Sequence, residues 1–294
     1  MSDAPIARDF AQDPTLLPRV MDLLGVVFGF VPEQVQAAER IGLRWDEVSR
    51  PFVVTGDEPS APAVAHVGVL ELPLVVSGER VRAAGVHAVA THPDHRGRGH
   101  YRRAMVAALA YVDARFDVAI LSTGEPAIYE PFGFREVGEH RFVGEAPVVS
   151  RRPDVRPLDY DVEEDVSLLR DHLERREPVS QRFGLVRESA VFLFNQAKSP
   201  PLHAPALDAL LVADVEGGTL RLYDVVAHRM PTLEQIVACL PEDVERVEVY
   251  FEPSKLAADL LPEPHVLDGD DRLCVRGPLE CEGKPFLWPK PTRC

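Results

Sequence analysis

Apolar residues recur at helical spacing in two segments near the start of the chain. Residues 15–28 and 32–41 place apolar side chains three and four positions apart, which predicts two amphipathic helices. Pro32 suits the first turn of the second helix, because the first backbone N–H groups of a helix have no intrahelical partner. We therefore expect a pair of helices ahead of the first long strands.

Strand-like segments follow this helical pair. Residues 52–55, 63–76 and 81–90 are rich in β-branched and other apolar residues, which favours strands. Ser77, Gly78 and Glu79 stand between the last two segments and have the composition of a hairpin turn. Three antiparallel strands are expected to result.

A helix and a further strand complete the first half. Apolar side chains at steps of four, three and four after Gly99 predict a helix that packs one stripe on the sheet. Residues 117–122 predict the strand after it. The stripe consists of Met105, Leu109, Val112 and Phe116.

A proline-rich stretch divides the chain. The segment EAPVVSRRPDVRPLDY, residues 145–160, contains prolines that prevent a regular helix from running through it. We place the domain boundary here, with domains at residues 1–145 and 146–294.

The second half repeats the order of predicted strands and helices of the first half, with weaker sequence signals. Residues 209–214 and 220–228 predict paired strands, and residues 232–235 form a capping box that opens a helix ending near residue 240. Residues 247–251 predict the next strand. The order strand, helix, strand therefore occurs twice.

Composition limits the partners and the compartment. With 294 residues, of which 46% are hydrophobic, the chain is long enough for one large or two ordinary domains. A net charge of −15 opposes binding to nucleic acid or anionic membranes, and an acidic surface favours a cationic substrate. The N-terminus resembles no signal peptide, and the longest nearly apolar run, residues 23–31, is too short to span a membrane. We expect a cytoplasmic protein.

Four cysteines lie in the last fifth of the sequence, at spacings that match no zinc-binding pattern. We expect reduced, mostly structural thiols and no bound metal. They are Cys239, Cys274, Cys281 and Cys294.

The segment VHAVATHPDHRGRGHYRR, residues 86–103, predicts a site for a phosphate-bearing ligand. A helix start offers free backbone N–H groups and a partial positive charge to a polyanion. Gly97 and Gly99 let the backbone approach the phosphates, and Arg96 and Arg98 add positive charge. The patterns of a Walker loop and of a dinucleotide-binding fingerprint are both missing from the segment.

The pattern P-x-x-R-x-x-G between a strand and a helix resembles the coenzyme A loop of the GNAT acyltransferase superfamily. Pro93, Arg96 and Gly99 carry this resemblance, and Tyr101 stands where many relatives have glycine or alanine. The resemblance implies acetyl-CoA as the co-substrate.

A second motif narrows the resemblance. The segment AIYEPFGF, residues 127–134, is similar to the AIYxxFGF segment of the Eis-like (enhanced intracellular survival) acetyltransferases, and residues 95–99 match their HRxRG version of the loop. The resemblance covers most of residues 1–145. It implies an α/β (α+β) fold: a mixed, largely antiparallel GNAT sheet flanked by helices, and a second, degenerate GNAT-like lobe.

The second lobe is expected to keep this fold without binding the cofactor. Its turn, AHRMPTLEQ, has neither the glycines nor the paired arginines that hold a pyrophosphate. We expect no counterpart of the sterol-carrier-like domain of the Eis-like family. In similar acyltransferases, paired N-terminal helices form a wall of the acceptor-binding site.

The resemblance also implies which residues bind acetyl-CoA. The end of the strand, the loop and the first helical turn would hold the thioester and the diphosphate, and two residues after the following strand would flank the pantetheine arm. These residues are Val89, Ala90, Thr91, Arg96, Gly97, Arg98, Gly99, His100, Tyr101, Arg102, Gly124 and Glu125.

Transfer of an acetyl group to an amine needs a neutral amine, a polarised carbonyl and a proton for the thiolate. A backbone N–H near Val89 would face the thioester oxygen, and the resemblance assigns the general-acid role to Tyr129. Three groups remain open as the base: the carboxylate of Cys294, which the family resemblance suggests, His87, which has a suitable intrinsic pKa, and Glu71.

The sequence thus predicts an N-acetyltransferase that moves acetyl from acetyl-CoA to a primary amine of a small or cationic acceptor. An alternative is an acyl-CoA-binding regulatory or sensor protein without transfer activity. A third interpretation is a tandem acyltransferase similar to mycothiol synthase, which needs a cofactor-binding loop in the second lobe. The corresponding turn, AHRMPTLEQ, does not fit such a loop. A homo-oligomer is compatible with all three.

Overall fold

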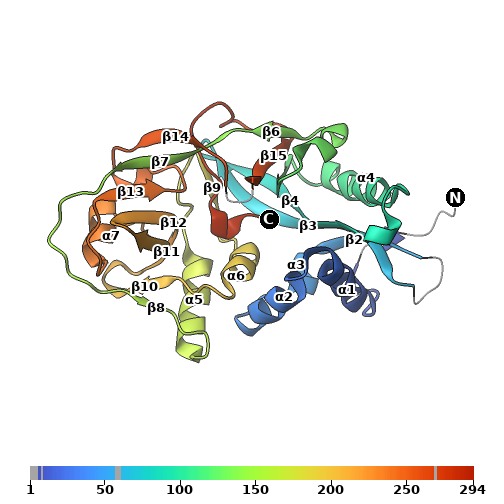
Figure 1. Ribbon diagram of the computed structural model, residues 1–294, viewed down its shortest axis with the longest axis horizontal. Helices are drawn as coiled ribbons and strands as arrows, with labels where there is room; N and C mark the ends of the chain where they lie inside the picture. Colours follow the sequence, from blue (N-terminus) through green and yellow to red (C-terminus); the bar gives the residue numbers. More distant parts are fainter. Residues whose placement is uncertain (1–5, 8, 57–60, 268–269) are drawn as a thin grey trace.

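The computed structural model of the chain describes residues 6–7, 9–56, 61–267 and 270–294. Two mixed, mostly antiparallel sheets lie side by side, each covered by helices (Figure 1). This arrangement confirms the predicted α/β fold class. Within the described residues, no helix combines the length and the apolar character needed to cross a membrane.

The first sheet has the order β1-β2-β3-β4-β5-β15-β6, and β9 pairs with the outer end of β3. Helices α1 and α2 cover one face, and α4 covers the other. Because both faces are covered, β3 is buried along nearly its whole length. The elements are β1 Ile6–Ala7, α1 Leu16–Phe28, α2 Val31–Arg40, α3 Trp45–Val48, β2 Arg50–Thr55, β3 Ala63–Val76, β4 Glu79–Thr91, α4 His100–Asp113, β5 Val118–Thr123, β6 Arg135–Val137, β9 Phe183–Leu185 and β15 Arg272–Arg276.

The second sheet has the order β14-β7-β13-β12-β11-β10-β8. The predicted capping box is present, since Thr232 accepts from the backbone of Gln235 and the Gln235 side chain accepts from the backbone of Thr232. The elements are β7 Glu139–Glu145, β8 Arg156–Pro157, α5 Glu163–Arg175, α6 Ala190–Gln196, β10 Leu202–Ala204, β11 Ala209–Glu216, β12 Thr219–Ala227, α7 Leu233–Cys239, β13 Arg246–Val249 and β14 Leu261–His265.

The two sheets share one plan and exchange a strand. In the first sheet, β4 and β5 run parallel, and β15 from the second half of the chain pairs antiparallel with β5. In the second sheet, β12 and β13 run parallel, and β7 from the first half pairs antiparallel with β13. Each sheet therefore receives the equivalent strand from the other half.

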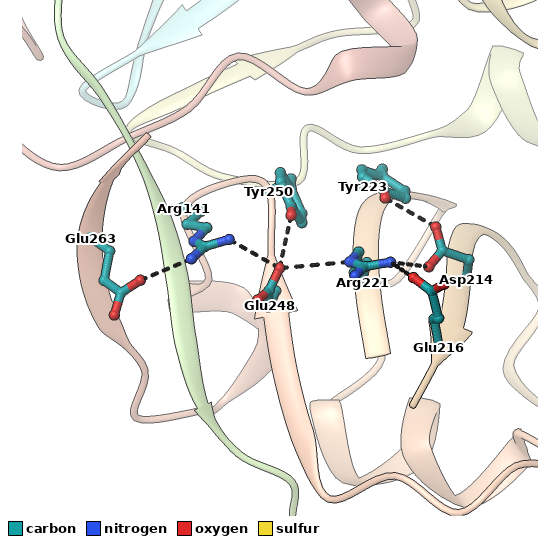
Figure 2. A network of polar contacts seen from close by, with 8 residues as sticks. All are labelled: Arg141, Asp214, Glu216, Arg221, Tyr223, Glu248, Tyr250 and Glu263. Atoms are coloured by element: carbon teal, nitrogen blue, oxygen red, sulfur yellow. Dashed lines mark hydrogen bonds and ion pairs between the residues drawn. The ribbon is translucent and has the colours of Figure 1, made fainter. Parts of the chain in front are cut away.

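Charged side chains hold the exchanged strand β7 in the second sheet. Arg141 of β7 contacts Glu248 on β13 and Glu263 on β14, each at 3.2 Å (Figure 2). Glu248 also accepts from Tyr250 at 2.8 Å, and Arg221 of β12 lies 3.9 Å from the same carboxylate. The ion pairs connect neighbouring strands across the sheet, as the backbone pairing does.

The exchange means that the predicted division at residues 145 and 146 does not coincide with the sheets. Strand β7 lies before that division and belongs to the second sheet, whereas β9 and β15 lie after it and belong to the first. Local composition marks a connection between elements but carries no information on which distant strand a segment pairs with.

Candidate active site

Strands β4 and β5 separate at the middle of the first sheet. Their parallel pairing covers Ala83–Gly85 and Val118–Ile120 and stops there. On the other side of β4, the register with β3 shifts between His66 and Gly68, and Ala88 has a φ of 49°. His66 Nδ1 donates to the oxygen of Ala88 at 2.7 Å and holds this bulge. The bulge directs the end of β4 away from β5 and opens a gap between them.

The last residues of the chain occupy the inner end of this gap. The backbone N–H of Ser122 on β5 donates to the oxygen of Cys294 at 3.0 Å. A Cβ added to Gly85 on β4 would lie 2.7 Å from Cys294 Sγ and 2.8 Å from Leu72 Cδ1, so glycine leaves room for both side chains. Arg293 donates to Ser122 Oγ at 2.8 Å and forms a buried ion pair with Glu139. The segment is therefore docked between the two strands.

The predicted phosphate loop turns sharply and opens α4. Gly97 and Gly99 have φ values of 73° and 80°, which side chains rarely adopt, and Gly99 caps the helix. Nothing lies within 4 Å of a Cβ built on either glycine, so the space beside them is open. Arg98 donates to the oxygen of Asp94 at 2.9 Å, and Arg96 to that of Thr91 at 3.4 Å. The loop is thus braced by its own arginines.

The surroundings of the loop are electropositive. Partial burial lowers the pKa of His100, and the charges of Arg103, His95 and Arg98 lower it further. The same positive potential favours an anion beside the first turn of α4. Arg102 lies apart from this cluster, with its guanidinium carbon 5.8 Å from the ring centre of Phe132.

A pocket of about 790 Å³ brings most of the predicted site residues together. Val89, Ala90, Thr91, Arg96, Tyr101, Gly124 and Glu125 line it, together with the three candidate catalytic residues His87, Tyr129 and Cys294. The other predicted cofactor residues do not line this pocket. They are Gly97, Arg98, Gly99, His100 and Arg102.

Tyr129 lies at the base of the pocket, 6% exposed. The pKa of its phenol is raised to about 12, mainly by burial and also by Cys274 and Glu125, while a hydrogen bond with Thr123 partly opposes the increase. The ring of Tyr101 meets that of Tyr129 edge to face at 6.3 Å, and the Tyr101 hydroxyl donates to the oxygen of Ile128 at 3.1 Å. Tyr101 thus points into the site and helps to orient Tyr129.

His87 is less basic than its residue type suggests. It is buried, with Nε2 3.0 Å from Ser49 Oγ, and burial together with the neighbouring His66 lowers its pKa to about 3. The expectation of a suitable pKa for a base is therefore wrong, because desolvation disfavours the imidazolium. Glu71 is exposed and does not line the pocket, which removes the third candidate base.

Sequence reasoning missed one wall of the pocket. Ala190, Val191 and Phe194 belong to α6, a short helix of the second half that the sequence analysis did not predict. Trp45 on α3 packs against Phe194 with ring centres 5.6 Å apart. The signal available was the apolar run of residues 190–194, which by itself does not reveal its partner.

The cysteines take no part in disulfides, and within the described ranges no group of three or more His, Cys, Asp or Glu side chains is arranged to hold a metal ion. Burial raises the pKa of the Cys294 thiol to about 12, so it is a neutral wall of the pocket. The groups of the site that can take part in proton transfer are therefore its hydroxyl, backbone and carboxylate groups.

Comparison with solved structures shows the same two-lobed fold. A probable N-acyltransferase from Enterococcus faecalis matches with a TM-score of 0.60 and 14% identity, over 94% of this chain and 72% of that one. Eis1 from Mycobacterium abscessus matches with a TM-score of 0.56 and 19% identity, over 92% and 73%. A GCN5-related N-acetyltransferase from Kribbella flavida matches with a TM-score of 0.51 and 21% identity, over 89% and 68%.

Sequence comparison identifies the first lobe. No curated protein sequence matches the chain, but residues 12–137 match the family model described as an acetyltransferase (GNAT) domain. The matched residues include the glycine turn, both strands that border the gap, and Tyr129. The chain therefore carries a GNAT acetyltransferase domain and is an acyltransferase.

Proposed function

We propose that the protein transfers the acetyl group of acetyl-CoA to a primary amine. The observation that carries this proposal is a single pocket that includes the gap between β4 and β5. Arg96 of the loop and Tyr129 both line this pocket. Such a pocket suits a long cofactor that is held by its diphosphate at one end and reacts at the other.

The diphosphate would bind at the start of α4. Backbone N–H groups of the first helical turn and the electropositive surroundings of His100 favour it there, with Arg96 and Arg98 beside it. The pantetheine arm would then run between Val89–Thr91 on β4 and Gly124 after β5. The bulge at Ala88 takes Val89 out of the register with β3, and the N–H of Val89 would point at the thioester oxygen and stabilise the developing oxyanion.

In the transfer step, the amine nitrogen attacks the thioester carbonyl carbon. A C–N bond forms, the C–S bond breaks, sulfur leaves with the electron pair, and the nitrogen loses one proton. The phenol of Tyr129 has a pKa of about 12, and a thiol with the pKa of cysteine, about 8.5, is the stronger acid, so full proton transfer to sulfur costs about 5 kcal/mol. Tyr129 would therefore assist by a hydrogen bond to the sulfur.

The carboxylate of Cys294 is the base that we retain. Its oxygen is fixed by Ser122 beside the gap, and the positive charge of Arg293 is offset by Glu139. His87 would act as a neutral hydrogen-bonding group next to Ser49 and would not carry the proton. We propose that the amine proton passes to the Cys294 carboxylate.

Two measurements test the proposed function. Calorimetry should detect binding of acetyl-CoA and of coenzyme A, and a disulfide reagent should detect release of the free thiol when an amine is supplied. Arg96→Ala should weaken cofactor binding about tenfold, because a charge-assisted contact to phosphate is lost. Tyr129→Phe should leave binding unchanged and slow transfer. Tight cofactor binding without turnover for any amine would favour the sensor alternative.

A further inference from the structure

The pocket has an acceptor end that is almost entirely apolar. Its wall comes from three separate parts of the chain: the α1–α2 junction, α3 and α6. Phe28 and Phe30 are 38% and 57% exposed. Contact of apolar rings with water is unfavourable in free energy, and a ligand that covers the rings would remove this cost. The side chains that line this end include Val27, Phe28, Phe30, Leu43, Trp45, Val48, Ala190, Val191 and Phe194.

Two polar pairs stand at this end, and the indole Nε1 of Trp45, which can only donate, is buried without a hydrogen-bond partner. Ser49 and His87 are hydrogen-bonded to each other at 3.0 Å, and His87 is neutral because burial lowers its pKa to about 3. The guanidinium of Arg293 is held by Glu139. Neither pair offers a free negative charge to a substrate, and the carboxylate of Cys294 is engaged with the reacting nitrogen in the proposed transfer.

The acidic side chains that line the pocket come from other elements than its apolar wall. Glu125 follows β5, and Asp271 immediately precedes Arg272, which pairs with Thr123 at the end of β5. Both carboxylates therefore come from the β5 side of the pocket, and neither belongs to α1, α2, α3 or α6. Burial raises the pKa of Asp271, and Arg293 lies close enough for its charge to oppose this increase. Glu125 and Asp271 are the only Asp or Glu side chains among the described residues that line the pocket.

This distribution discriminates between amines by charge. The nitrogen that attacks the thioester is neutral when it reacts, so it needs no counter-charge in the apolar end of the pocket. A second ammonium on the same substrate stays charged, and burying it without a carboxylate costs several kcal/mol. Apolar carbon in its place would instead be stabilised by burial.

We propose that the acceptor is a monoamine on a compact apolar or aromatic body, such as a medium-chain alkylamine or an arylalkylamine, and not a polycation. This inference rests on the proposed function and narrows the small or cationic acceptor expected from the sequence. Among the residues that the structure describes, the apolar wall contributes no Asp or Glu side chain to the lining of the pocket. The net charge of −15 therefore gives no preference for cationic substrates at the acceptor end. The products are the N-substituted acetamide and coenzyme A.

A matched amine series tests the inference through thiol release with acetyl-CoA. We expect kcat/KM to rise about fourfold per methylene from butylamine to hexylamine, the equivalent of about 0.8 kcal/mol per buried CH₂. Hexylamine and phenethylamine should exceed 1,6-diaminohexane and spermidine by at least tenfold. A preference for the diamine or for spermidine would overturn the inference and leave the acetyltransferase proposal standing. No thiol release with any amine would overturn both.

A pair of variants on α1 tests the location. Phe28→Glu adds a carboxylate to the acceptor end, whereas Val26→Glu adds one on the same helix outside the pocket, at a position that is 56% exposed. The ratio of kcat/KM for hexylamine to that for 1,6-diaminohexane should fall at least tenfold in Phe28→Glu and stay unchanged in Val26→Glu. Equal ratios in both variants would place the acceptor elsewhere. Calorimetry with coenzyme A verifies that each variant retains its cofactor site.

Discussion

The ion pair between Glu139 and Arg293 is expected to hold the end of the chain in the active site. Glu139 begins the exchanged strand β7, and Arg293 adjoins Cys294. Both side chains are 5% exposed, and two guanidinium nitrogens of Arg293 donate to the two carboxylate oxygens at 2.9 and 2.5 Å. The N–H of Trp288 donates to the same carboxylate at 2.8 Å. Glu139→Gln removes the negative charge and keeps the size of the side chain.

The expected cost follows from the burial of the pair. In Glu139→Gln, the new amide oxygen would still accept one hydrogen bond, but the guanidinium would be left without a counter-charge in a buried position. Removing one partner of a buried ion pair costs about 3–5 kcal/mol, and the retained hydrogen bond places this variant near the lower value. Displacement of Arg293 would also release Cys294 from Ser122. The activity of the folded variant should therefore fall as well, beyond the loss that unfolding alone would cause.

Urea denaturation measures the free energy of unfolding, and thiol release measures the activity. Glu136→Gln is the matched control, because Glu136 of β6 pairs with Arg272 at 3.3 Å in an exposed position, with side chains 45% and 41% exposed. An exposed pair contributes at most about 1 kcal/mol. A loss below about 1 kcal/mol in Glu139→Gln, equal to that of the control and with full activity, would refute the proposed role of the buried pair.

Three further predictions concern the same site. Burial lowers the pKa of His66 to about 4 and that of His87 to about 3, so between pH 6.5 and pH 4 the unfolded chain binds more protons at these two positions than the folded chain does. Each histidine should therefore lower the free energy of unfolding by about 1.4 kcal/mol per pH unit as the pH falls, and His87→Asn should reduce the slope measured in urea titrations by that amount; an unchanged slope would contradict the neutral, buried His87. Gly85→Val should displace Cys294, whose Sγ lies 2.7 Å from the added Cβ, and should abolish thiol release in a protein whose circular dichroism is unchanged; wild-type turnover would contradict the docking of this residue. Tyr129→Phe should lower kcat about tenfold or more with KM for acetyl-CoA unchanged in steady-state kinetics, and an equal loss of affinity would remove the tyrosine from the chemistry.

The sequence alone determined several local elements and the glycine turn that opens α4. The apolar stripe at Met105, Leu109 and Val112 is buried as predicted, and β3 has the predicted bounds. Gly97 and Gly99 adopt the left-handed conformations that a tight turn requires. These features depend on residues close together in the chain, so spacing and residue type suffice to predict them.

Only the tertiary structure decided how the halves combine into a site. The exchange of β7 and β15, the docking of Cys294 against Ser122, and the wall that Phe194 adds from α6 are long-range contacts without a local sequence signal. The pKa of His87 is lowered to about 3 because distant segments bury its ring beside His66. Pairing, burial and desolvation depend on which distant segments meet, and that is fixed only when the whole chain packs.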